Sequence, residues 1–151
     1  MLADTPLAFG ETLENARRWG ESEWRMRSAR GEAADQILVV AIDRSSGSWL
    51  GTMGGFVASG PDVTGALLVG AYVTPAYRGR SFGVAGALLT EIEAWAVTVG
   101  TELFLHVHED NPRAIAFYQR NGYRMTGKVE QYILNPSQRE LEMVNALDPV
   151  A

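Results

Sequence analysis

The stretch VTPAYRGRSFGVA, residues 73–85, decides the fold. An apolar run over residues 66–73 leads into it and predicts a strand, and apolar residues at helical spacing over residues 84–99 predict a helix. The loop between them holds two arginines and two glycines. Glycine lets backbone N–H groups approach a ligand closely, and the first turn of a helix carries unpaired donors and partial positive charge. This order therefore predicts an anion site that is best suited to phosphate; the alternative is a surface turn with solvated arginines.

A second motif, HEDNPRAIAFYQRNGY, occupies residues 108–123. Asn111 is a good helix N-cap, and a proline follows it at the first helical position. The predicted helix ends near Arg120, before an Asn-Gly pair that tolerates left-handed backbone geometry. Tyr118 follows Asn111 by seven residues, so both lie on the same face of the helix, two turns apart.

Together, the two motifs resemble those of the GNAT superfamily of acetyl-coenzyme A-dependent N-acetyltransferases. The first resembles its pyrophosphate loop, Arg/Gln-x-x-Gly-x-Gly/Ala. The second resembles its signature Asn-x-x-Ala-x-x-x-Tyr-x-x-x-Gly-Phe, with Tyr123 in place of the Phe. The resemblance covers residues 66–143. It implies a transferase (acyltransferase) that moves an acetyl group from acetyl-CoA to a primary amine, of a small molecule or a protein N-terminus, by direct attack.

Composition limits the other possibilities. A chain of 151 residues, 46% hydrophobic and 21% charged, predicts one soluble domain with a full core. It has no cysteine, which excludes disulfides, thiolate catalysis and Cys-ligated zinc. The net charge of −5, without a basic stripe, argues against a nucleic-acid partner. No apolar run has the length of a membrane span and no signal peptide is apparent, so we expect a cytoplasmic protein without a membrane partner.

The remaining pattern predicts a mixed α/β (α+β) fold with flanking helices and a central, mostly antiparallel sheet. The resemblance implies that the two strands flanking the loop splay apart to leave a cleft for the cofactor. Relatives begin with a further strand, so either the natural start lies upstream of this sequence or the first strand is missing. A missing strand would leave a sheet edge exposed to pairing with another chain, and because the resembled family often dimerises, a homodimer is expected. The predicted elements are two helices over residues 1–31, strands over 37–42, 49–59 and 66–73, a helix over 84–99, a strand over 101–107, a helix over 111–120, strands over 123–125 and 132–134, a turn over 135–137 and a last strand over 140–144.

Two registers of the pyrophosphate loop compete. The register over residues 78–83 keeps the usual distance from the preceding proline but places Ser81 where the family has Gly, whereas the register over residues 80–85 fits the whole pattern in a longer loop. We favour the second. In either register, the guanidinium of Arg78 or Arg80 is expected to pair with phosphate. The predicted cofactor-binding residues are Tyr72, Val73, Arg78, Gly79, Arg80, Ser81, Phe82, Gly83, Val84, Ala85, Asn111 and Tyr118.

The resemblance makes Tyr118 the candidate general acid. A phenol with an ordinary pKa of about 10 is protonated at neutral pH and can give its proton to the departing sulfur. The base is open. Leu67 stands where histone-modifying relatives carry a Glu, and His106 stands where ribosomal-protein N-terminal acetyltransferases carry one. His106 is therefore predicted to be a base or to position a water, with packing on the sheet as the alternative; Glu109, Glu130 and Tyr132 are weaker candidates.

Other sites and functions are weighed against these. His106 and His108 share a face of their strand, but no third ligand accompanies them, so no metal is expected. The resemblance implies acceptor contacts near the N-terminal helices, where Phe9 and Trp24 are candidates and packing on the sheet is the alternative. Residues 131–137 are a second candidate region, and a place beside the acceptor is considered for Gly54 and Gly55. The competing functions are a non-catalytic acyl-CoA sensor, which the leucine at position 67 would fit, and a generic phosphate-binding module.

Overall fold

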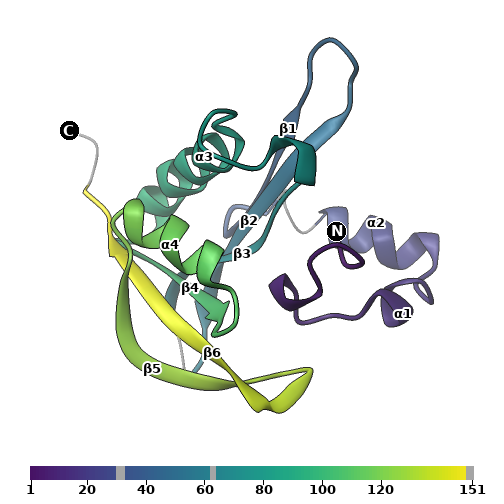
Figure 1. Cartoon of the computed structure of the whole chain (residues 1–151). Coiled ribbons are helices and arrows are strands. Elements are labelled where there is room, and N and C mark those ends of the chain that lie inside the picture. The colour runs from purple at the N-terminus through teal and green to yellow at the C-terminus, as the bar shows by residue number, and fades with distance from the viewer. Residues whose placement is uncertain (30–32, 62–63, 149–151) are drawn as a thin grey trace.

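A computed structural model gives the fold of the chain and describes residues 1–29, 33–61 and 64–148. Within these ranges, six strands form one sheet in the order β1-β2-β3-β4-β6-β5 (Figure 1). All neighbours in it are antiparallel except β3 and β4, so the predicted mixed, mostly antiparallel sheet is confirmed. The strands are β1 Gln36–Ile42, β2 Trp49–Ser59, β3 Thr64–Val73, β4 Glu102–His108, β5 Arg124–Tyr132 and β6 Asn135–Ala146.

The parallel pair separates along its length. Strands β3 and β4 are joined through helix α3, Val84–Val99, and they pair only between residues 66–68 and 103–105. Beyond Leu68 the edge of β3 has no partner in β4, although both strands continue. Gly70 lies in this free segment with φ of +62°, a left-handed conformation that a residue with a Cβ rarely adopts. The predicted splay is therefore present.

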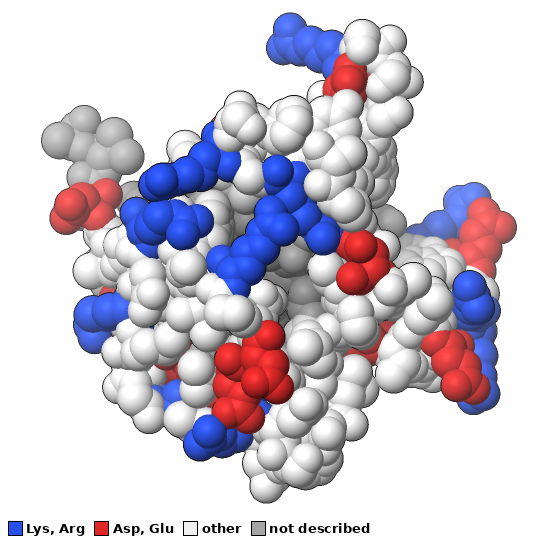
Figure 2. All heavy atoms as spheres, in the orientation of Figure 1, with Lys and Arg blue, Asp and Glu red and all other residues white. Residues whose placement is uncertain are grey.

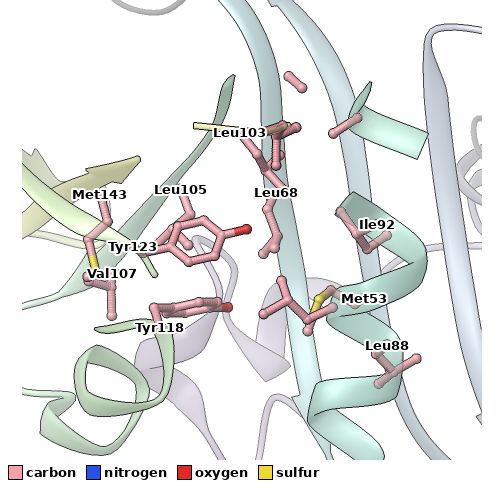
Figure 3. Packing of buried hydrophobic residues seen from close by; sticks show 14 of the residues in the cluster. Met53, Leu68, Leu88, Ile92, Leu103, Leu105, Val107, Tyr118, Tyr123 and Met143 are labelled. Atoms are coloured by element: carbon pink, nitrogen blue, oxygen red, sulfur yellow. The ribbon is translucent and has the colours of Figure 1, made fainter. Parts of the chain in front are cut away.

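The core lies between the sheet and the helices α3 and α4, Pro112–Arg120 (Figure 1). Helix α3 buries the apolar stripe expected from its spacing, including Leu88 and Ile92. Figure 3 shows these side chains meeting Leu68 and Leu103 from the parallel strands, with the rings of Tyr118 and Tyr123 beside them.

Helix α3 approaches the sheet closely at Gly55. A Cβ on this residue would lie 2.7 Å from Cζ3 of Trp95. Gly55 is thus a contact between strand and helix within the core, and an ideal Cβ on Gly54 would face the backbone of β1 and β3. The considered place of these two glycines beside the acceptor has no support in these contacts, since both are explained by packing.

The prediction of two helices over the first 31 residues is wrong in extent. The described part of this region has a 3-10 turn at Pro6–Ala8 and the helices α1, Leu13–Ala16, and α2, Glu21–Ala29. No residue of α2 is buried, and Trp24 is half-exposed. Without an apolar stripe held against the core, little stabilises longer helices here. The predicted helix end at Gly31 lies outside the described residues.

The last hairpin also differs from the prediction. Tyr132 pairs with Asn135, so the turn is Ile133-Leu134, and residues 135–137 belong to β6 rather than to a turn. The register is set further along, where Val129 pairs with Leu141, because Leu141 packs against the core. In the described ranges, no helix is both long and apolar enough to cross a membrane.

Candidate active site

A cavity of about 500 Å³ lies beside the free edge of β3, between the loop that follows this strand, the start of α3 and helix α4. Figure 2 shows basic side chains beside the hollow at the centre of this face. We call this cavity the cleft. It is lined by nine of the predicted cofactor-binding residues: Tyr72, Val73, Arg78, Gly79, Arg80, Gly83, Ala85, Asn111 and Tyr118.

The loop reaches the cleft through two left-handed glycines. Gly79 has φ of +115° and Gly83 has φ of +67°, and Gly83 is the N-cap of α3. An added Cβ at either position would meet no atom within 4 Å, so the space in front of this backbone is open. The first N–H groups of α3 have no acceptor within the helix, and Ala85 and Gly86 line the cleft. This start of α3 is therefore suited to an anion.

The two arginines of the loop differ in their partners. The Nε atom of Arg78 donates to the carbonyl of Val73 at 2.7 Å, its guanidinium pairs with the carboxylate of Asp4, and it lies 5.6 Å from the ring centre of Tyr72. Arg80 is exposed and has no ion pair with any residue that the structure describes. Arg80 is thus the loop guanidinium that is free to meet a ligand.

Three predicted cofactor-binding residues do not line the cleft. Ser81 and Phe82 are exposed, and the ring of Phe82 meets that of Tyr77 edge-on at 5.4 Å. Val84 is buried in the core.

Helix α4 brings Asn111 and Tyr118 to the opposite wall. The side chain of Asn111 accepts the backbone N–H of Ala114 at 3.2 Å, which confirms the expected N-cap. Tyr118 is only 6% exposed, and burial raises its pKa well above the ordinary value. In Figure 3 its hydroxyl points toward Met53, which also lines the cleft. Within the described ranges this hydroxyl has no hydrogen-bond partner.

Tyr123, which stands in place of the family's Phe, has a structural explanation. It is buried, its hydroxyl donates to Oε1 of Glu93 on α3 at 3.1 Å, and Asn145 donates to the same oxygen at 3.3 Å. Burial and the neighbouring Glu93 carboxylate both raise the pKa of Tyr123. The extra hydroxyl therefore ties the end of α4 to α3.

His106 is not among the residues that line the cleft. Its Nε2 lies 3.4 Å from Oε2 of Glu142 and its Nδ1 lies 4.0 Å from Oε2 of Glu130. His108 is buried; its Nδ1 accepts the N–H of Asp110 at 3.0 Å. In the ranges that the structure describes, no three His, Cys, Asp or Glu residues are grouped so as to hold a metal ion.

The other candidate bases have partners outside the cleft. Glu109 bonds to Arg139, with Oε2 2.7 Å from a guanidinium nitrogen, and these bonds lower the pKa of Glu109. The hydroxyl of Tyr132 donates to the carbonyls of Pro6 and Phe9. Glu130 belongs to the group around His106. No described residue that lines the cleft is a carboxylate or a histidine.

Two arginines on α4 were not among the predicted site residues. Arg113 and Arg120 line the cleft, and neither has an ion pair with a described residue. A signal was present in the sequence, since the two are seven residues apart and so share a helix face. With Arg80, they surround the opening with unpaired positive charge.

A model of a known protein family matches most of the chain. The family model described as the acetyltransferase (GNAT) family matches residues 7–123. No curated protein matches the sequence. Among solved structures, a phosphinothricin acetyltransferase of the GNAT superfamily from Sinorhizobium meliloti, in complex with AcCoA, is similar at a TM-score of 0.70 and 20% identity, over 93% of this chain and 75% of that one.

Two further solved structures share the fold. An aminoglycoside 6′-N-acetyltransferase complexed with coenzyme A is similar at a TM-score of 0.64 and 18% identity, over 92% of this chain and 87% of that one. A GCN5-related N-acetyltransferase from Kribbella flavida is similar at a TM-score of 0.68 and 24% identity, over 86% of this chain and 79% of that one. Because the family model covers most of the sequence, this chain belongs to the acetyltransferase (GNAT) family.

Proposed function

We propose that the protein is an acetyl-CoA-dependent N-acetyltransferase that acts on a primary amine of a small molecule or a protein N-terminus. One observation carries the proposal: a single cleft unites the glycine-arginine loop, the free edge of β3 and the face of α4 that holds Asn111 and Tyr118. Two structures with the same fold are an acetyltransferase with AcCoA and an N-acetyltransferase with coenzyme A, which supports this choice of cosubstrate.

The residues present fit acetyl-CoA. The phosphates of the coenzyme would meet the free N–H groups at the start of α3 and the guanidinium groups of Arg80, Arg113 and Arg120. The unpaired edge of β3 at residues 71–73 offers backbone groups to an extended arm, as a missing strand would. The open space in front of Gly79 and Gly83 is what a close backbone–phosphate contact requires.

The chemistry follows from two groups on this chain. A neutral amine attacks the thioester carbonyl, the C–N bond forms, and the C–S bond breaks. Tyr118, which burial keeps protonated, gives its proton to the leaving sulfur. A base must take the proton that the amine loses, and we assign this role to His106, directly or through a water.

Thermal melting with acetyl-CoA tests the site first. Saturation at 100 times the dissociation constant should add about 2.7 kcal/mol of stability. We expect a clear rise in Tm for the wild type and a smaller one for Arg80→Ala. Arg124→Ala is the matched control, because Arg124 is exposed and lies outside the cleft. No shift at millimolar acetyl-CoA would refute the proposed site.

A non-catalytic acyl-CoA sensor is the second candidate, favoured by the lack of any carboxylate or histidine among the described cleft residues. Leu67, paired with Phe104 across the parallel strands, supplies no base. Release of the coenzyme A thiol in the presence of phosphinothricin, an aminoglycoside, spermidine and a peptide with a free N-terminus distinguishes the two. Binding without amine-dependent release would identify a sensor. The expected single domain, cytoplasmic location and homodimer stay predictions.

A further inference from the structure

A buried carboxylate lies opposite His106 on the sheet face that points away from the core. Leu105 and Val107 belong to the core, and since side chains alternate along a strand, His106 faces the other way. Its partner in the neighbouring strand is Glu142, which is only 6% exposed. An ionised group in such a position is unfavourable unless it is paired.

The contacts of Glu142 orient the imidazole. Its Oε1 accepts the hydroxyl of Thr126 at 2.9 Å, and its Oε2 lies 3.4 Å from Nε2 of His106. A carboxylate only accepts, so this contact favours the tautomer with the proton on Nε2. The Nδ1 atom then carries the lone pair, and its carboxylate neighbour, Oε2 of Glu130, is 4.0 Å away, beyond hydrogen-bond distance.

His106 lies where the two parallel strands separate. The pairing of β3 with β4 ends at Leu105, so His106 is the first residue of β4 beyond the paired segment. Tyr118 packs in the core on the other side of β4. A thioester held between the separated strands would therefore have Tyr118 on one side and His106 on the other.

We propose that Glu142 is a positioning residue, which holds Nε2–H of His106 and leaves Nδ1 free to take the proton of the attacking amine. This inference rests on the proposed function. The amine nitrogen bonds to the acetyl carbon, its proton passes to Nδ1 directly or through a water, and the C–S electron pair takes the proton of Tyr118. The imidazolium later loses its proton to solvent while Tyr118 regains one.

Several charged groups face His106 and bear on a pH profile. They are Lys128 and Glu130 on β5, Glu140 and Glu142 on β6, and His108 on its own strand. The turn at Pro6–Ala8, which contacts β4, contributes no titratable side chain. Glu142 is the most buried of the three carboxylates, so its replacement is expected to change the profile most.

The decisive variant is Glu142→Gln, which keeps the shape and loses the charge. With the best amine of the panel, we expect kcat/KM for the amine to fall by about tenfold or more, as for loss of general-base efficiency, with the KM for acetyl-CoA unchanged. The acidic limb of the pH profile should move to lower pH, because the substitution removes a negative charge 3.4 Å from the imidazole. Glu142→Asp should restore the wild-type limb in part. Glu109→Gln is the control, since Glu109 bonds to Arg139 and not to His106.

The outcomes separate the two proposals. A wild-type pH profile and kcat/KM in Glu142→Gln would overturn the positioning role. So would a loss of rate with an unmoved acidic limb and a reduced acetyl-CoA melting shift, which would indicate a structural role alone. A wild-type protein that binds acetyl-CoA and acetylates no amine would instead refute the proposed function, before any variant is compared.

Discussion

Tyr118 is a buried residue, and its hydroxyl, beside the cleft, has no hydrogen-bond partner in the described ranges. At the edge of a cleft, this arrangement keeps the phenol protonated and available to a ligand atom. Such a position is typical of a functional group rather than of a packing residue.

Tyr118→Phe should separate the two roles. Because no hydrogen bond to described residues is lost, we expect the Tm and the acetyl-CoA melting shift to stay close to those of the wild type. The kcat should fall by about 100-fold, the lower end of the range for general acid catalysis. Steady-state thiol release measures this, and an unchanged kcat with a substrate whose chemistry is rate-limiting would exclude Tyr118 as the acid.

Tyr123 is expected to act on stability alone. Loss of its bond to Glu93 in Tyr123→Phe should destabilise the fold by about 1–2 kcal/mol at pH 7. Its raised pKa also predicts a pH dependence. A folded pKa above the unfolded value of about 10 means that the stabilisation is complete below pH 10 and is lost as the pH rises further.

Urea unfolding at pH 7, 9 and 10.5 checks this prediction. The wild type should lose stability above about pH 10 more steeply than Tyr123→Phe. Equal slopes for the two proteins would show that Tyr123 ionises in the folded state as readily as in the unfolded one.

At the scale of elements, the contact between β2 and α3 depends on a missing side chain. In Gly55→Ala, the new Cβ would lie 2.7 Å from the ring of Trp95, so the ring or the helix must move. We expect a loss of about 1–3 kcal/mol in the free energy of unfolding, typical of overpacking. Gly20→Ala is the control, since its Cβ would meet only Ser22 Oγ at 4.0 Å. Equal stability of the two variants would mean that the ring of Trp95 can move aside at little cost in free energy.

Gly86, in the first turn of α3, should show two opposite effects. Alanine is the better helix former, and a Cβ here would meet no atom within 4 Å, so Gly86→Ala should gain about 0.5–1 kcal/mol of stability. The same methyl group would project beside the cleft, which Gly86 lines, and weaken acetyl-CoA binding. Melting without ligand and titration calorimetry with acetyl-CoA measure the two effects. If Gly86→Ala binds acetyl-CoA as tightly as the wild type, the phosphates of the coenzyme do not lie beside Gly86.

The elements that the sequence predicts well are those whose local pattern and final packing agree. The stripe of α3 and the caps of α4 were readable because 3.6-residue periodicity and capping chemistry act locally. The turn of the last hairpin was placed wrongly because its register is set by Leu141, far from the turn residues. The N-terminal region was assigned too much helix because its apolar residues find little core to cover.

The site residues also fall into two groups, those that a local motif predicts and those that it does not. The loop glycines, Asn111 and Tyr118 were predicted from short motifs and line one cleft. The partner of Arg78 could not be predicted, because Asp4 is 74 residues away and no local pattern joins the two. Neither motif predicts a role for Arg113 and Arg120, although their spacing places them on one helix face.

At the scale of the whole molecule, the charge is divided unequally. The chain carries a net charge of −5, whereas Arg80, Arg113 and Arg120 line the cleft without ion pairs to described residues. A polyanionic ligand is therefore attracted locally by a protein that repels it at a distance. Salt screens both effects, with a Debye length of about 10 Å at 0.1 M.

Replacement of the α4 arginines tests this distribution. In Arg113→Ala/Arg120→Ala, we expect the Kd for acetyl-CoA to rise by about tenfold at low salt, as for loss of about 1.4 kcal/mol. The dependence of Kd on salt should become shallower, because fewer charge pairs remain to be screened. Calorimetry at 25 and 250 mM NaCl measures both. Wild-type affinity in the double variant would mean that these arginines only neighbour the ligand.

The pairing of Asp4 with Arg78, together with the bonds from Tyr132 to Pro6 and Phe9, ties the first residues of the chain to the cofactor loop on one side and to the last hairpin on the other. By thermodynamic reciprocity, whatever disturbs this amino-terminal strap changes the affinity for a ligand in the cleft, and the ligand changes the mobility of the strap by the same free energy. An expression tag fused to Met1 would begin three residues from Asp4, whereas the carboxyl end of β6 lies in a different part of the fold (Figure 1). The end of the chain that carries the tag is therefore an experimental variable, and binding constants for this protein are comparable only between samples that share the same amino terminus.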